Sequence, residues 1–121
     1  MNNLELLACR KLLFLEVNEA AKYIGNVEAR TWRYYESGRS NLPEAIRSRM
    51  QGLLQRRASL LEELRQQAAD YRKQGNGRQV VPFFTSFEQF QQETGLPDLL
   101  EWRIDMSVKS SLYLEDAIVF Y

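Results

Sequence analysis

The stretch from residue 17 to residue 43, VNEAAKYIGNVEARTWRYYESGRSNLP, constrains the fold more than any other part of this 121-residue chain. Its apolar spacing predicts two short amphipathic helices, over residues 17–24 and 28–37. A tight turn separates them, and Gly38 and Pro43 mark the end of the second helix. The chain must therefore fold around a compact pair of helices rather than around one continuous helix or a sheet.

The two predicted helices have small residues where they must meet. A tight turn of this kind brings helices together at roughly 90–120°, and this requires small side chains at the crossing. Ala21 and Gly25 lie one helical turn apart in the first helix, whereas Trp32 and Tyr35 share one side of the second. We expect these two aromatic residues in the core, and the pattern as a whole predicts a helix-turn-helix motif.

The outer face of the second helix carries side chains suited to nucleic acid. In a helix-turn-helix protein this helix enters the DNA major groove and its first residues contact base edges. We expect Arg30, and next Arg33, to contact bases, because a guanidinium can donate two hydrogen bonds to guanine O6 and N7. Tyr34 is a candidate for a thymine methyl group or a phosphate, and Glu28 for cytosine N4. The plainer alternative is that both arginines are solvated surface residues and Glu28 a favourable helix N-terminal charge.

Polar residues on either side of this helix are candidates for phosphate contacts, which position a protein on DNA without specifying sequence. They are Asn18 near the start of the first helix, and Arg39, Ser40 and Asn41 after the second, with Arg47 and Arg49 as weaker candidates.

The segments on both sides of the motif are predicted to be helical. A helix over about residues 3–14, before the motif, has an apolar stripe formed by Leu4, Leu7, Ala8, Leu12 and Leu15. A second stripe runs from Pro43 to about residue 73. It predicts one long helix, or two helices with a break at Gly52 or at Arg56-Arg57, that buries its stripe partly against a partner chain.

The C-terminal half is predicted to hold one short strand and two helices. Residues 74–77 (QGNG) are a helix breaker, residues 80–84 favour a strand, and residues 117–121 are apolar but ambiguous. Helices are expected over residues 87–93 and 99–114. The aromatic residues here are expected in a core or an interface; they are Phe83, Phe84, Phe87, Phe90 and Trp102.

The predicted fold class is therefore mainly α. It comprises a helix-turn-helix bundle in residues 1–57, with a long helix, and a small C-terminal dimerisation region in residues 58–121. The net charge of zero conceals an uneven distribution: residues 1–57 hold 10 Lys or Arg and 6 Asp or Glu (+4), and residues 58–121 hold 6 and 10 (−4). Such polarity indicates one face toward nucleic acid and one face away from it.

Composition argues against several other classes of protein. The chain has no histidine and a single cysteine, Cys9, which excludes histidine-based zinc sites, histidine acid-base catalysis and an intrachain disulfide. Cys9 is expected to be a buried small residue. With no nucleophile motif or phosphate-binding loop, we expect no enzyme, no cofactor and no metal. No apolar run approaches the roughly 20 residues of a membrane span, and a cytoplasmic location is expected.

The motif resembles the lambda-repressor/Cro-like helix-turn-helix superfamily through Ala21, Gly25, the run Tyr35-Glu36-Ser37-Gly38 and Pro43. In that superfamily an arginine of the helix before the motif, here the helix over residues 3–14, pairs with the glutamate of the run. The resemblance therefore implies a structural salt bridge between Arg10 and Glu36. The chain departs from the superfamily in two ways: its turn between Gly25 and Trp32 is one residue longer, and Glu16-Val17 replaces a polar pair at the start of the helix over residues 17–24.

Nearly the whole chain resembles the anti-CRISPR-associated helix-turn-helix regulators and a related group of enterobacterial proteins. The similar segments are ELLACRKLLFLEVNEAAKYIG, EARTWRYYESGRSNLP, VVPFF and EWRIDMSVKSSLY. The resemblance implies a homodimer that binds inverted-repeat DNA and represses its own operon, such as an anti-CRISPR operon. The functional arginine of the family's recognition helix matches Arg30. Two alternatives stay open, a regulator that binds RNA hairpins and an antitoxin-like module whose acidic half covers a basic partner.

Overall fold

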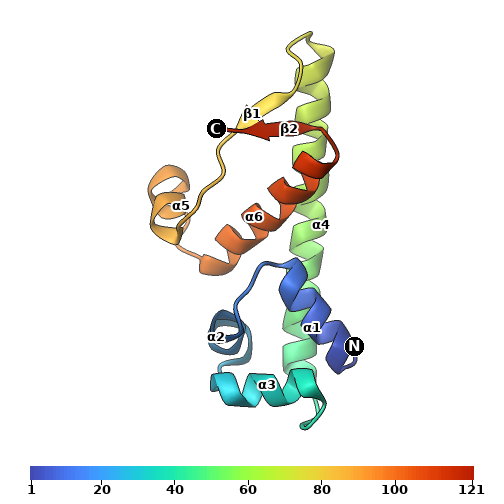
Figure 1. Ribbon diagram of the computed structural model, residues 1–121, viewed down its shortest axis with the longest axis vertical. Helices are drawn as coiled ribbons and strands as arrows, with labels where there is room; N and C mark the ends of the chain where they lie inside the picture. Colours follow the sequence, from blue (N-terminus) through green and yellow to red (C-terminus); the bar gives the residue numbers. More distant parts are fainter. The chain divides into compact units, whose positions relative to one another are not determined.

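The computed structural model describes residues 1–121 and is mainly helical (Figure 1). It divides into two compact units, residues 1–55 and residues 56–121, with the boundary inside helix α4. This confirms the predicted mainly α fold, with a helix-turn-helix and one long helix. The elements in order are α1 (Asn3–Leu12), α2 (Val17–Ala20), the π-helical segment η1 (Ala21–Gly25), α3 (Ala29–Ser37), α4 (Glu44–Lys73), β1 (Gln79–Val81), α5 (Phe87–Thr94), α6 (Leu99–Leu114) and β2 (Ile118–Phe120).

The core of the first unit is built around Trp32, whose side chain is completely buried. Tyr35 packs edge-on against it with ring centroids 6.2 Å apart, so both aromatic residues are in the core as predicted. Gly25 lies against the indole: a Cβ atom there would come within 3.1 Å of Trp32 Cε3 and 3.0 Å of Val27 Cγ2. The other buried apolar residues of this unit are Leu6, Leu13, Leu15, Ala20, Ala21, Ile24, Ile46 and Met50.

The helix before α3 ends in a locally widened turn. Residues Ala21–Gly25 form a π-helical turn, and Asn26 adopts a left-handed conformation with φ of 51°. The N–H of Val27 then donates to the carbonyl of Ala21 at 3.0 Å. The π-helical turn widens the helix at this point, and the left-handed Asn26 ends it before α3 begins.

The buried face of α1 differs from the predicted stripe. Leu4 and Leu12 are 66% and 45% exposed, whereas Leu6 and Leu13 are buried. The leucine-rich sequence offers two stripes, and periodicity alone does not choose between them. The buried stripe is the one on the side of Arg10. Leu6, Arg10 and Leu13 follow one another at helical spacing, and Arg10 pairs with Glu36 of α3. Cys9 is half-buried rather than fully buried, and burial raises the pKa of its thiol.

Helix α4 is one continuous helix, and neither Gly52 nor Arg56-Arg57 interrupts it. In the second unit, Arg56 pairs with Glu101 of α6 at 3.0 Å. The Arg57 guanidinium donates to the hydroxyls of Ser107 and Ser111 at 2.8 and 2.7 Å. These contacts fasten α6 to this part of α4. None of the helices has the length and apolar character that crossing a membrane requires.

An aromatic cluster fills the core of the second unit, as predicted from the sequence. Phe84, Phe90 and Trp102 are buried, and Phe87, Leu99 and Met106 pack against them. The indole N–H of Trp102 donates to the carbonyl of Phe84 at 3.0 Å, so the buried polar atom of the cluster is satisfied.

Two short parallel strands complete the second unit, where the sequence predicts only one. Gln79, Val80 and Val81 of β1 pair with Ile118, Val119 and Phe120 of β2. The first strand ends before Pro82, which has no N–H to donate to a ladder, and so it lies earlier than the predicted range 80–84. The tail that was ambiguous in the sequence becomes a strand only through this pairing with a segment far away along the chain.

Candidate nucleic-acid interface

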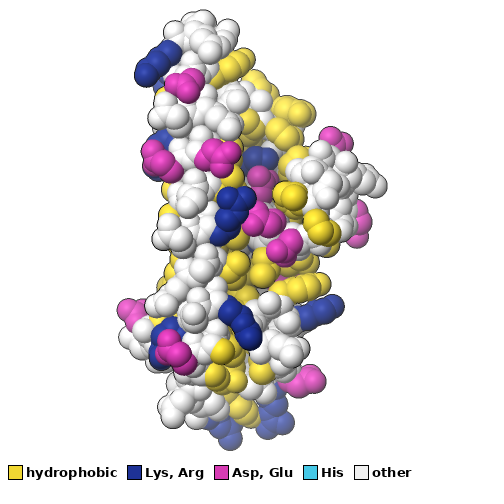
Figure 2. All heavy atoms as spheres, turned by 180° about the vertical axis from the view of Figure 1, so that it is seen from behind, with side chains coloured by type: hydrophobic (Ala, Val, Ile, Leu, Met, Phe, Trp, Pro, Cys, Tyr) yellow, Lys and Arg dark blue, Asp and Glu magenta, His cyan; other side chains and the backbone are white.

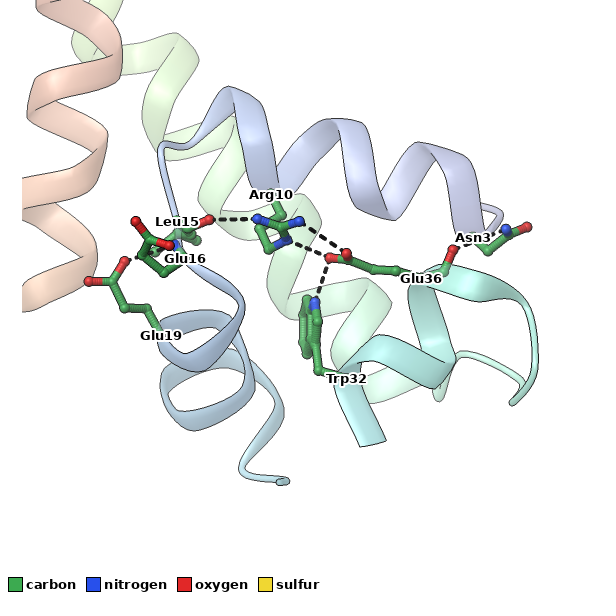
Figure 3. Close-up of polar contacts among 7 residues, drawn as sticks. All are labelled: Asn3, Arg10, Leu15, Glu16, Glu19, Trp32 and Glu36. Carbon is green, nitrogen blue, oxygen red and sulfur yellow. Dashed lines mark hydrogen bonds and ion pairs between the residues drawn. The ribbon is translucent and has the colours of Figure 1, made fainter. Parts of the chain in front are cut away.

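The orientation of α3 is set by Glu36, which accepts three side-chain hydrogen bonds (Figure 3). Arg10 of α1 donates from Nε to Oε2 at 2.6 Å and from Nη2 to Oε1 at 3.1 Å. Trp32 donates from its indole N–H to Oε2 at 2.6 Å, and Arg10 Nη1 also reaches the carbonyl of Leu15 at 2.9 Å. The side chains of Arg10 and Glu36 are only 12% and 10% exposed. This buried network fixes the rotation of α3 about its own axis.

Local contacts define where the two helices of the motif begin and end. The backbone N–H of Glu16 donates to Glu19 Oε1 at 2.9 Å (Figure 3), which satisfies a free donor at the start of α2. Glu28 has an extended backbone directly before α3, and Gly38 ends α3 in the left-handed region with φ of 81°. The side-chain amide of Asn3 donates to the carbonyl of Glu36 at 3.1 Å and closes the last turn of α3.

With Trp32 and Glu36 directed inward, the helical repeat places a polar face on the opposite side of α3. Arg30, Arg33 and Ser37 are exposed there, and Tyr34 is half-buried. The structure thus brings the predicted base-contacting residues of α3 together on one face. Figure 2 shows Lys and Arg side chains gathered along the edge of the first unit that α3 forms. Glu28, the fourth predicted residue, is exposed just before the helix.

Tyr34 is in contact with two arginines. Arg30 donates from Nε to the Tyr34 hydroxyl at 2.7 Å, with its guanidinium carbon 5.5 Å from the ring centroid. The guanidinium carbon of Arg39 lies 4.4 Å from the same centroid. The carbonyl of Tyr34 also accepts from the backbone N–H of Ser40 at 3.1 Å and from the hydroxyl of Ser37 at 3.2 Å. The face of α3 and the loop that follows it are therefore locally connected.

The four main residues predicted to contact phosphate lie at the surface of the first unit. Asn18 on α2 and Arg39 and Asn41 after α3 are exposed, and Ser40 is partly exposed. Ser40 and Asn41 line a polar hollow of about 230 Å³. These four residues are accessible to a ligand of the first unit.

The two weaker candidates are instead engaged within the protein. Arg47 pairs with Glu44 at 2.6 Å and donates to the carbonyl of Met1 at 3.3 Å. Arg49 donates to the carbonyl of Ile24 at 2.7 Å and supports the turn before α3. Both side chains therefore stabilise the first unit.

One exposed aromatic residue near the motif was not singled out from the sequence. Tyr23 is 43% exposed, and the ammonium group of Lys22 lies 5.1 Å from its ring centroid. The small residues Ala20 and Ala21 of the same helix face inward and are buried. Because Tyr23 lies outside this buried face, its aromatic side chain was the signal in the sequence for a further exposed group.

The architecture and this site define a helix-turn-helix protein with a basic, solvent-exposed second helix. A family model described as Aca2/YdiL-like matches residues 1–120, and the chain belongs to this family. It is 35% identical over 115 residues to the Aca2 repressor of Pectobacterium phage ZF40, with 95% of each chain covered. It is 26% identical over 119 residues to the uncharacterised protein YdiL of Escherichia coli strain K12, with 96% of each chain covered. These findings confirm the family resemblance seen in the sequence.

Proposed function

We propose that this protein is a transcriptional repressor that binds double-stranded DNA with α3 in the major groove. The observation that carries the proposal is the exposed face of α3, where Arg30 and Arg33 lie on a helix held by a buried ion pair. The name of the phage relative, a repressor, supports the same conclusion. Arg30 and Arg33 are the proposed base contacts, with Glu28 beside them, while Asn18 and the loop residues 39–41 contact phosphates.

We further propose that the operator is an inverted repeat bound by a homodimer, with two α3 helices about 34 Å apart. The second unit offers a surface for dimerisation. Its two-stranded sheet has both outer edges unpaired, and unpaired edges readily bind another strand. Large apolar side chains are exposed on or near this sheet: Val80 is 51% exposed, Tyr113 52%, Leu114 84% and Tyr121 79%. In Figure 2 hydrophobic side chains gather over the strands.

The direct test is selection of bound sequences from random DNA duplexes. The proposal requires an inverted repeat with a fixed half-site spacing. Arg30→Ala should then lose operator affinity by about 1–3 kcal/mol, the discrimination typical of one bidentate arginine–guanine pair. Lys73→Ala, which removes one positive charge from the exposed last turn of α4, is the matched control and should bind normally.

Gel-shift titration of both variants against the selected operator decides the matter. Unchanged operator affinity of Arg30→Ala, with its unfolding curve as for the wild type, would contradict the assignment of Arg30. A transcript RNA that outcompetes the selected duplex would contradict DNA as the main target. Autorepression is tested with a reporter fused to the region upstream of the protein's own gene, where wild type should lower expression and Arg30→Ala should not.

A further inference from the structure

Tyr34 lies between two arginines of opposite proposed roles. Arg30, one helical turn before it, is a proposed base contact, and Arg39, beyond the end of α3, is a proposed phosphate contact. The hydroxyl of Tyr34 holds the first at 2.7 Å, and its ring faces the guanidinium carbon of the second at 4.4 Å. One half-buried side chain thus touches both.

The hydrogen bond from Arg30 uses only part of the guanidinium. It is donated by Nε, which leaves Nη1 and Nη2 available. These terminal nitrogens form the end of the fork that can donate to O6 and N7 of guanine. An arginine side chain has many rotamers in solution, and restricting them before binding reduces the entropy lost on association. The Tyr34 hydroxyl therefore orders Arg30 without occupying its recognition end.

The contact with Arg39 is of a different kind. A guanidinium over a tyrosine ring is held by the cation–π attraction, which needs the ring but not the hydroxyl. The loop that carries Arg39 is anchored to the same residue, because the Tyr34 carbonyl accepts from Ser40 N–H and from the Ser37 hydroxyl. The N–H of Arg39 in turn donates to the Ser37 hydroxyl at 3.4 Å. Substitutions of Tyr34 can therefore test the contribution of the ring and that of the hydroxyl separately.

We propose that Tyr34 is a positioning residue: its hydroxyl sets Arg30 for base contact and its ring sets Arg39 for phosphate contact. This replaces the direct contact of Tyr34 with a thymine methyl group or a phosphate that the sequence suggested. The inference rests on the proposed DNA-binding function. Tyr34 then contributes to DNA binding through the positions of Arg30 and Arg39, without touching the DNA itself.

Tyr34→Phe and Tyr34→Leu separate the two roles. Tyr34→Phe removes the hydroxyl alone and should lower operator affinity about threefold to tenfold. Its affinity for non-operator DNA and the salt dependence of binding should not change. Tyr34→Leu also removes the ring, and the slope of log affinity against log salt should become shallower by up to about 0.9, the value for one phosphate contact. Arg39→Ala should give the same change in slope while retaining sequence preference.

A double-mutant cycle tests whether the hydroxyl acts through Arg30. In the Arg30→Ala background, measured at low salt where residual binding persists, adding Tyr34→Phe should cause no further loss of affinity. An equal loss in both backgrounds would overturn the proposal, because it would mean that the hydroxyl contacts DNA itself. Unfolding curves of each variant show whether a loss of affinity comes from destabilisation of the fold.

A measurement without DNA keeps this inference distinct from the proposed function. In the ¹H–¹⁵N spectrum of the free protein, the Nε–H resonance of Arg30, identified by its absence in Arg30→Lys, should be protected from exchange with water. It should lose that protection in Tyr34→Phe. An Nε–H that exchanges equally fast in both proteins would overturn the positioning role. Failure to select any DNA sequence, with this protection intact, would contradict the proposed function instead.

Discussion

Arg10 of α1 and Glu36 of α3 form a bidentate ion pair within the first unit, and neither side chain is more than 12% exposed. The pair spans two helices, and α3 carries the proposed DNA contacts on its other side. The contribution of this pair therefore bears on both the stability of the unit and the presentation of α3.

Glu36→Ala should lower the free energy of unfolding by about 3–5 kcal/mol, because it leaves the Arg10 guanidinium buried without its counter-charge. Urea unfolding followed by tryptophan fluorescence measures the loss. The matched control is Glu44→Ala, whose ion pair with Arg47 has the same 2.6 Å distance but a glutamate that is 77% exposed. That variant should lose less than about 1 kcal/mol, and equal losses would show that burial of the first pair has no consequence.

Gly25→Ala should destabilise the protein by about 1–3 kcal/mol, because the added methyl group must displace well-packed atoms of Trp32 and Val27. The control is Gly52→Ala in α4, where a Cβ atom meets nothing within 4 Å. Since glycine is a poor residue within a helix, Gly52→Ala should stabilise by up to about 1 kcal/mol. Thermal unfolding should give shifts of opposite sign, and a stabilising Gly25→Ala would contradict the close helix crossing.

Two adjacent serines of α6 should differ in their effect on the second unit. Ser111→Ala removes a hydroxyl that accepts from Arg57 at 2.7 Å, and hydrogen bonds to charged groups typically contribute about 1.5–3 kcal/mol. Burial lowers the pKa of Arg57, as expected for a guanidinium partly removed from water. Ser110→Ala, one residue earlier, should have an effect within about 0.5 kcal/mol. Chemical unfolding of the two variants should rank them in this order; a reversed order would refute the role of Arg57.

Asp105 should make stability depend on pH. Burial raises the pKa of its carboxyl group above the ordinary value of 3.8, and the ammonium of Lys109, 2.9 Å away, offsets this only in part. Between the ordinary and the raised pKa the folded state binds the proton more tightly than the unfolded state. The stability that Asp105 contributes therefore falls as the pH rises through this range and is constant above it.

Asp105→Asn provides the reference for this effect, because its amide stays neutral at every pH. The free energy of unfolding of the wild type minus that of Asp105→Asn should decrease as the pH is raised from about 3.8. Unfolding curves across the acidic range measure this difference. A difference that grows with pH would show that attraction to Lys109 outweighs the cost of burying the carboxylate.

The features that the sequence revealed are those determined by neighbouring residues. Ala21, Gly25 and Trp32 lie close together in the chain, and their sizes alone predict a close helix crossing. The apolar stripe predicts helix from Pro43 to about residue 73 but leaves open one helix or two, and the structure shows that it is the single helix α4. The outward position of Arg30 follows from the inward position of Trp32, since both are on one helix with a known repeat.

The features that the sequence did not reveal depend on distant partners. The family resemblance implied the pairing of Arg10 with Glu36, but local periodicity alone did not distinguish the buried Leu6 and Leu13 of α1 from the exposed Leu4 and Leu12. The strand Ile118–Phe120 exists through pairing with β1. Arg49 looked available for phosphate because its acceptor, the carbonyl of Ile24, belongs to a backbone turn whose position is set only by the fold.

The division of the chain inside α4 has a consequence for proteolysis. Trypsin sites at Arg56 and Arg57 lie at the boundary between the units, but their peptide bonds are within a helix, and a protease needs extended, accessible backbone. Lys73 and Arg78 are on either side of the exposed loop at residues 74–77, where Gly75 and Gly77 have positive φ. Limited trypsin digestion should therefore cut first beside this loop, so the first fragments will not correspond to the two units.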